Sequence, residues 1–244
     1  MRRVLLVVQY DGTDYHGFQR QPGLPTIQQE LERALGELLG EDVTITGAGR
    51  TDAGVHALGQ TATFETDRPI PTQRIAGALT CLLPEAVSVV SATEVPADFH
   101  PRYDAVGKLY AYRILNREPP SPFIGRYAWH VTEPLDVELM RAGAEHLLGT
   151  HDFVAYSSSG GSVADTVREL RRLAVEREDE LVEIRAEASG FLYMMVRRMV
   201  GTLVEVGRGR LAVEEVGLIL AARDRRRVPL VAPPQGLSLI KVIY

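Results

Sequence analysis

The chain contains one cysteine, two lysines and no run of 18 apolar residues. A single cysteine excludes an internal disulfide and a zinc site built on several thiolates. A membrane-spanning helix needs about 20 apolar residues, and the short apolar run from Val4 to Val8 does not suffice for a signal peptide either. We therefore expect a soluble, cytoplasmic protein with no membrane contact. Cys81, beside Leu79 and Leu82 in an apolar helical pattern, is expected in the core.

Positive charge is also in the minority, since the 244 residues carry a net charge of −5. This argues at first against a nucleic-acid partner, because phosphate binding usually needs a basic surface. However, residues 188–244 hold nine basic and four acidic side chains, and 25 of the 27 basic residues are arginine. Arginine contacts phosphates bidentately and stacks on bases. A compositional bias of the genome or a thermostable surface explains the same pattern, and charge alone does not separate these readings.

The first part of the chain alternates strand and helix patterns. Thr26 and Gln29 form a capping box, and Gly40 stands where a C-terminal glycine belongs, so a helix is expected over 27–39. Pro84 ends a second helical pattern. The expected elements are a strand at 3–9, helix 27–39, strands at 43–46 and 61–66 separated by a glycine-rich loop at 47–59, helix 72–83 and strand 87–95.

The second part repeats this kind of order after a proline-containing segment, 96–107, which we read as a crossing between domains. Its expected elements are strand 108–115, helix 135–148, a hairpin of 166–176 and 181–188, helices 191–206 and 213–223, and strand 237–243, with a flexible SSSGG loop at 157–161. The pattern predicts an α+β protein of two ferredoxin-like, RRM-like halves, with an N-terminal domain 1–105 and a C-terminal domain 106–244. Such sheets often bind RNA, although fold alone does not assign a function.

The most unusual segment is GAGRTDAGVHA, which brings Arg50, Asp52 and His56 together on a loop with three glycines. A phosphate-binding P-loop is rejected because no GxxxxGK[ST] pattern exists. A metal site is weakly supported, since the six histidines are scattered and HExxH is absent, and GxSxG of a serine hydrolase is also missing. Asp52 as a simple turn residue remains open on this segment alone. A carboxylate beside a guanidinium can also act as a nucleophile or base without a metal, because the positive charge keeps it ionised.

Four blocks in order along the chain resemble the TruA family of tRNA pseudouridine synthases. The central block, GAGRTDAGVHALGQ, resembles the family's signature, and the other three are YDGTDYHGFQRQP (10–22), FHPRYDAVGKLYAYRI (99–114) and SGFLYMMVRRMVGTLVEVGRG (189–209). Together they cover both halves of the chain. The resemblance implies the pseudouridine synthase fold, with two antiparallel sheets joined around a central cleft. It also implies an isomerase that needs neither metal nor cofactor.

By that resemblance Asp52 is the aspartate that attacks the target uridine, on either the base or the ribose. Tyr110 takes the position of the tyrosine that stacks on the target base and helps to remove the C5 proton. From the residues alone, a core tyrosine on an alternating strand is the competing interpretation. Arg197 corresponds to the basic residue that pairs with Asp52, and Arg50 to one that fills the space of a flipped nucleotide. Arg198 stands where many members carry asparagine, so an exchange of roles between Arg197 and Arg198 stays open.

Further residues are expected at the substrate surface. Phe18, Gln19 and His56 match family positions near the active cleft, with packing as the alternative. The candidate phosphate contacts are Arg208, Arg210, Arg223, Arg225, Arg226 and Arg227, for which a solvated helix end is the alternative. The resemblance further implies a homodimer that binds tRNA and modifies uridines at positions 38 to 40 of the anticodon stem-loop, without specifying how many of the three.

Two other classes of protein compete with this hypothesis. A non-catalytic RNA-binding protein would bind without forming product and would tolerate loss of Asp52. A metal-dependent hydrolase or nuclease would be inhibited by chelators and would release cut or dephosphorylated product. The isomerase hypothesis instead predicts a product of unchanged mass and salt-sensitive RNA binding.

Overall fold

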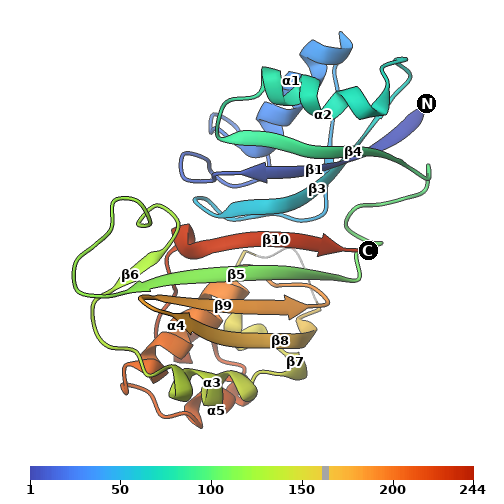
Figure 1. Ribbon diagram of the computed structural model, residues 1–244. Helices are drawn as coiled ribbons and strands as arrows, with labels where there is room; N and C mark the ends of the chain where they lie inside the picture. The colour runs from blue at the N-terminus through green and yellow to red at the C-terminus, as the bar shows by residue number, and fades with distance from the viewer. Residues whose placement is uncertain (161–164) are drawn as a thin grey trace. The chain divides into compact units, whose positions relative to one another are not determined.

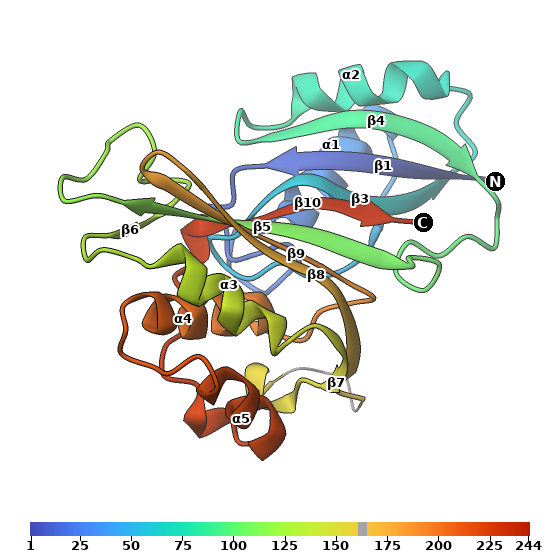
Figure 2. The same ribbon diagram turned by 60° about the horizontal axis from the view of Figure 1, so that its bottom comes forward.

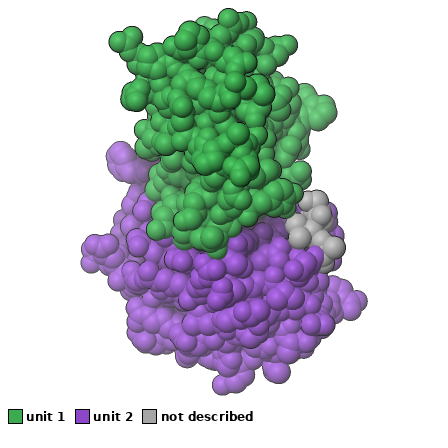
Figure 3. Space-filling model, turned by 90° about the vertical axis from the view of Figure 1, so that its right-hand side faces the viewer, with its two compact units in different colours: residues 1–106, 238–244 green, residues 107–237 purple. Residues whose placement is uncertain are grey.

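The computed structural model describes residues 1–160 and 165–244 (Figure 1). Gly161, the last residue of the expected 157–161 loop, lies outside the described residues. The chain forms two compact units, one of residues 1–106 with 238–244 and one of residues 107–237, coloured separately in Figure 3. That the two halves fold as independent domains divided at residue 105 stays a prediction. No helix in the described part of the chain is long and apolar enough to span a membrane.

The first unit contains a mixed sheet. Its strands are β1 (Arg2–Tyr10), β2 (Thr46–Gly47), β3 (His56–Thr66), β4 (Val87–Val95) and β10 (Leu237–Ile243). They lie in the order β4-β1-β3-β10, and β2 pairs with β3. β1 is antiparallel to both of its neighbours, whereas β10 runs parallel to β3. The final strand of the chain therefore completes the sheet that the first strands begin.

Two helices cover this sheet, α1 (Ile27–Leu39) and α2 (Thr72–Leu82). The Thr26 hydroxyl accepts the Gln29 amide at 3.4 Å, and Gly40 ends α1 with a φ of 69°, so the expected N-terminal cap at Thr26 and the C-terminal glycine are confirmed. α2 packs on β4 through a buried face that includes Leu79. The expectation of a buried Cys81 is wrong, because the side chain is exposed. Cys81 lies two residues beyond Leu79, and two residues correspond to a rotation of about 200° around the helix axis. The Cys81 side chain is therefore turned away from the sheet that Leu79 faces.

The strands beside the glycine-rich loop differ from the expected ones. β2 has only two residues, and β3 begins at His56 rather than Thr61. His56 and Ala57 pair with Ser238 and Leu239 of β10, which lie about 180 residues further along the chain. Because that partner is distant in sequence, the local pattern of glycines gave no sign of it. The shaped loop is consequently shorter, and it ends at Val55.

The second unit contains its own antiparallel sheet, in the order β5-β9-β8-β7. Its strands are β5 (Gly107–Asn116), β6 (Trp129–Val131), β7 (Gly149–Asp152), β8 (Val167–Glu178) and β9 (Leu181–Ala188), with β6 parallel to β5. The expected hairpin between β8 and β9 is confirmed, and Asp179 makes its turn with a φ of 52°. Both sheets with their helices confirm the α+β class that the sequence predicted.

The helices of the second unit pack on one face of that sheet (Figure 2). They are α3 (Val137–Glu145), α4 (Met195–Gly207) and α5 (Glu215–Ala222), with short 3₁₀ turns η1 (Val154–Tyr156), η2 (Arg225–Arg227) and η3 (Pro234–Gly236). α4 begins four residues later than expected, because Met194 adopts a left-handed φ of 59° that interrupts the helix. A side chain at Gly201 would place its Cβ 2.1 Å from the Leu230 carbonyl oxygen, so glycine allows the following chain to cross α4 closely.

Candidate active site

Asp52 lies in the loop between β2 and β3, and main-chain hydrogen bonds fix this loop at several points. The Ala48 amide donates to the Thr61 carbonyl at 2.9 Å, and the Gly54 amide donates to the Tyr15 carbonyl at 3.2 Å. Within the loop, the Val55 amide donates to the carbonyl of Asp52 at 3.1 Å. The loop is therefore a defined turn, and Asp52 presents a half-buried side chain from it.

The residue before Asp52 is held from beneath by a buried tyrosine. The Tyr10 hydroxyl lies 2.8 Å from Thr51 Oγ1, and both side chains are buried. The Thr51 carbonyl accepts the Phe18 amide at 3.2 Å. Burial raises the pKa of Tyr10 to about 12, and the nearby polar side chains of Thr51 and Gln60 offset part of the rise. Tyr10 consequently keeps its proton at neutral pH and remains a hydrogen-bond partner of Thr51.

The glycines of the 10–22 segment allow it to lie directly against the loop. A Cβ at Gly17, whose φ is +86°, would lie 2.4 Å from the Thr51 carbonyl oxygen. A Cβ at Gly12 would lie 2.0 Å from the Val55 carbonyl oxygen. Both distances are far below contact, so only glycine fits at either position. This contact explains why two sequence blocks separated by about 30 residues belong to one candidate site.

Phe18, Gln19 and Arg50 take different places around the loop. Phe18 is 3% exposed, and its ring centroid lies 6.5 Å from that of Tyr10. Gln19 and Arg50 are exposed, and Arg50 Nε donates to Gln19 Oε1 at 2.7 Å. The buried Phe18 packs beneath the loop, whereas the Arg50–Gln19 pair presents polar groups to solvent beside Asp52.

His56 is 4% exposed at the first position of β3. Its Nδ1 accepts the Gly12 amide at 3.1 Å, and the same nitrogen lies 3.2 Å from a carboxylate oxygen of Asp11. Nδ1 can accept from Gly12 only while it carries no proton, so this bond corresponds to the tautomer protonated on Nε2. In this arrangement His56 links the 10–22 segment to the end of the Asp52 loop.

The second unit supplies the other residues to which the resemblance gives a chemical role. Tyr110 lies on β5 opposite Ala186 of β9, and it is 8% exposed. The edge of one ring meets the face of the other between Tyr110 and Phe191, with centroids 5.1 Å apart. This contact joins the 99–114 and 189–209 blocks.

The adjacent arginines of α4 point to different partners. Arg197 Nε donates to the Ala232 carbonyl at 2.8 Å, and the Ala232 amide donates to the Arg197 carbonyl at 3.0 Å. Arg198 is buried, and its Nη2 donates to the carbonyls of Ala155 and Arg225. Burial, followed by the nearby charge of Arg225, lowers the pKa of Arg198. Arg198 thus joins α4 to the η1 and η2 turns of its own unit.

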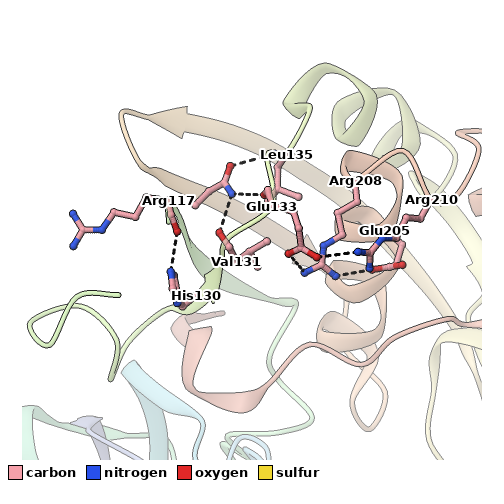
Figure 4. Close-up of polar contacts among 9 residues, drawn as sticks. Arg117, His130, Val131, Glu133, Leu135, Glu205, Arg208 and Arg210 are labelled. Atoms are coloured by element: carbon pink, nitrogen blue, oxygen red, sulfur yellow. Dashed lines mark hydrogen bonds and ion pairs between the residues drawn. The ribbon is translucent and has the colours of Figure 1, made fainter. Parts of the chain in front are cut away.

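Arg208 and Arg210 lie in a carboxylate network at the end of α4 (Figure 4). Arg208 donates to Glu133 at 2.9 Å and to Glu205 at 2.7 Å, and its side chain is only 12% exposed. Arg210 contacts the other oxygen of Glu133 at 2.9 Å. The Arg208 guanidinium also lies 5.7 Å from the centroid of the Trp129 ring. A phosphate at this place would have to compete with Glu133 for both arginines.

The arginines around η2 are more accessible. Arg226 is 90% exposed and pairs with Asp224 at 2.8 Å, while Arg223 pairs with Asp152 at 3.2 Å. Arg225 Nε donates to Ser157 Oγ at 3.1 Å, and Arg227 pairs with Glu215 at 3.2 Å. η2 therefore presents positive charge to solvent.

The expected site residues divide between the two units. Asp52, Arg50, Gln19, Phe18 and His56 belong to the first unit, and Tyr110, Arg197 and the remaining arginines belong to the second. The sequence reasoning missed Tyr10, Thr51 and Gln60. Their signal was present, since Thr51 and Gln60 are polar residues inside the GAGRTDAGVHALGQ block and Tyr10 opens the first block. Across residues 1–160 and 165–244, no group of three His, Cys, Asp or Glu side chains is arranged to hold a metal ion.

Comparisons with known proteins match the chain along its whole length. A family model described as tRNA pseudouridine synthase matches residues 6–104 and 144–244. Three proteins described as tRNA pseudouridine synthase A align over 244 residues, covering all of this chain and all of each relative. They come from Thermoanaerobacter sp. (strain X514) at 47% identity, Acetivibrio thermocellus at 46% and Geotalea daltonii at 43%.

Proposed function

Because this chain belongs to the tRNA pseudouridine synthase family, and is therefore an isomerase that converts uridine to pseudouridine in tRNA, we propose that it modifies the anticodon stem-loop with Asp52 as its nucleophile. The proposed targets are the uridines at positions 38 to 40. The observation that supports Asp52 most directly is its place in the loop. Hydrogen bonds hold Thr51 and the main-chain carbonyl of Asp52, while the Asp52 side chain stays half-buried at the surface of the unit.

The proposed reaction needs no external reactant. The Asp52 carboxylate attacks the ribose C1′ or the base, the bond between C1′ and N1 breaks, and the base rotates. A bond then forms between C1′ and C5, the C5 proton leaves, and N1 gains a proton while Asp52 is released. Product and substrate have the same mass, since one C–N bond is exchanged for one C–C bond and one proton moves from carbon to nitrogen.

The remaining proposed roles follow the chemistry of each side chain. Tyr110 offers a ring face to the target base and a phenol oxygen for the C5 proton. Arg197 keeps the Asp52 carboxylate ionised, and Arg50, oriented by Gln19, fills the space of the flipped nucleotide. For Arg198, the bonds to Ala155 and Arg225 support a structural role instead.

We further propose that the enzyme works in the cytoplasm as a homodimer that holds one tRNA across both copies. Pairing two chains would bring the basic residues of 188–244 from each copy to one RNA-binding surface, so that a chain with a net charge of −5 can still present a locally basic surface to phosphates. Among the arginines, the exposed η2 turn is the proposed phosphate contact. Light scattering at assay concentration would give twice the chain mass if this part of the proposal holds.

The test of the function is pseudouridine mapping on an unmodified tRNA transcript, with chelator present and Asp52→Asn beside the parent. Asn has nearly the same shape as Asp but cannot act as a nucleophile, so we expect no product with tRNA binding kept within about threefold. Asp42→Asn, at an exposed position of the same unit, is the matched control and should retain full activity.

Each alternative has its own outcome in this assay. Product at sites outside the anticodon stem-loop would reject the target while retaining the reaction. Product formed by Asp52→Asn would reject the nucleophile. Binding without product by the parent would favour the non-catalytic RNA-binding class, and a cleaved transcript would favour the nuclease class.

A further inference from the structure

Two buried side chains, Gln60 and Tyr10, form hydrogen bonds beneath the Asp52 loop. Gln60, 0% exposed on β3, donates from Nε2 to the Gly49 carbonyl at 3.1 Å. Its Oε1 accepts the Thr61 amide at 3.1 Å. Since a backbone amide can only donate, this second bond fixes which side of the carboxamide is oxygen and which is nitrogen.

A second buried hydrogen bond reaches the loop from β1. The Tyr10 hydroxyl lies 2.8 Å from Thr51 Oγ1, and either oxygen can be the donor of this bond. Tyr10 is 4% exposed and Thr51 is 6% exposed, so the bond is shielded from solvent.

These two bonds hold the loop on both sides of Arg50. Gln60 fixes the carbonyl of Gly49, and Tyr10 fixes the side chain of Thr51, the residue bonded to Asp52. Because a buried polar group left without its partner is destabilising, the two bonds together favour one loop conformation over others.

We propose that Tyr10 and Gln60 are positioning residues that set the direction of the Asp52 carboxylate through Thr51 and Gly49. Neither side chain touches substrate, since both are buried under the loop. The inference rests on the proposed role of Asp52. It adds that the rate of the chemical step depends on two residues outside the GAGRTDA sequence.

Tyr10→Phe tests the proposal by removing one oxygen while keeping the ring. A misplacement of about 1 Å in a reacting group can cost about a hundredfold in rate, so we expect the single-turnover rate to fall about ten- to a hundredfold. The dissociation constant for tRNA should stay within about twofold, because phosphate contacts lie on other residues. A loss in affinity with an unchanged rate would overturn the proposal.

The matched control is Tyr156→Phe in the second unit. The Tyr156 hydroxyl is also buried, and it donates to the Val216 carbonyl at 3.1 Å. The two variants should lose similar stability, measured by urea unfolding, but only Tyr10→Phe should lose rate. An equal rate loss in both would show a general effect of destabilisation and would reject positioning.

Thr51 provides a second, milder pair of variants. Thr51→Ser keeps the hydroxyl and should remain close to the parent rate, whereas Thr51→Val keeps the shape without the hydroxyl and should be slow. If Tyr10 acts through Thr51, Thr51→Val combined with Tyr10→Phe should be no slower than the slower single variant. Multiplied rate losses would overturn the proposal.

The Asp52→Asn assay separates failure of this inference from failure of the proposed function. An inactive Asp52→Asn with a fully active Tyr10→Phe rejects positioning alone. Product from Asp52→Asn rejects the nucleophile, whatever the Tyr10 variants show.

Discussion

Arg50 donates from Nε to Gln19 Oε1 at 2.7 Å, which joins an exposed arginine of the Asp52 loop to the block that begins at Tyr10. The bond uses one of the five N–H groups of the guanidinium. It restricts the rotation of a long side chain at a place where the proposed function needs it pre-oriented. The pair is therefore a specific test of how Arg50 contributes.

Gln19→Ala should lower the single-turnover rate by about two- to fivefold, because Arg50 then loses orientation but keeps its charge. Arg50→Ala should cost considerably more, and Arg50→Lys should not restore the rate, since an ammonium lacks the planar fork. Rates measured with saturating enzyme on one tRNA transcript would check this order. A Gln19→Ala variant as slow as Arg50→Ala would instead indicate that Gln19 contacts RNA itself.

Arg197 and Arg198 are adjacent in sequence, yet we expect their variants to fail in different ways. Arg198→Met removes the donor to the Ala155 and Arg225 carbonyls and should lower the free energy of unfolding by about 1–3 kcal/mol. Its rate per folded molecule should stay near that of the parent. Arg197→Met should reduce the rate about tenfold or more, because the Asp52 carboxylate loses its proposed partner.

Urea unfolding and single-turnover rates, measured on both variants at one temperature, separate these effects. If Arg198→Met were the slow but stable variant, the ion-pair role would belong to Arg198. This is the alternative that the sequence left open.

The sequence predicted most elements of the fold because their signals are local. The N-terminal cap at Thr26 and the glycine at 40 define α1 within a few residues of its ends. Where the sequence failed, the cause is a partner distant along the chain or a backbone conformation without a sequence signal. The early start of β3 depends on β10, and the late start of α4 depends on the left-handed Met194.

The candidate site shows the same division between local and distant signals. Asp52 and Arg50 stand out on a glycine-rich loop, and the family resemblance assigns their roles. By contrast, neither the fixed carboxamide of Gln60 nor its bond to Gly49 follows from any spacing. Its place at the end of the GAGRTDAGVHALGQ block is the only signal for Gln60, and that place does not identify its partner.

Asp152 should make the stability of the protein depend on acid pH. A hydrogen bond from Thr166, then one from the Val154 amide and the charge of Arg223, hold the pKa of Asp152 below its ordinary value. Since the folded state favours the ionised form, the contribution to stability is present above the unfolded pKa, near 3.9. It is lost as the pH falls through the lower folded pKa.

Asp152→Asn should therefore unfold at lower urea concentration than the parent at pH 7, with the difference shrinking below about pH 4. Asp42→Asn, at an exposed position, is the control for the general effect of removing one charge. A difference between parent and Asp152→Asn that stays constant from pH 7 to pH 3 would contradict the assigned cause.

The salt dependence of RNA binding should distinguish the arginines around η2 from those at the end of α4. Each phosphate contact adds about one to the slope of log affinity against log salt, so Arg226→Gln should reduce that slope by about one and weaken binding at low salt. Arg208→Gln should leave the slope unchanged, since the Arg208 guanidinium is already held by Glu133 and Glu205. It should instead lower the free energy of unfolding, because two carboxylates lose a partly buried counterion.

Binding isotherms at four salt concentrations with the Asp52→Asn background, which prevents turnover, would measure both slopes. A reduced slope for Arg208→Gln with an unchanged one for Arg226→Gln would place the phosphate contacts at the end of α4, and would require Glu133 to release its arginines when tRNA binds.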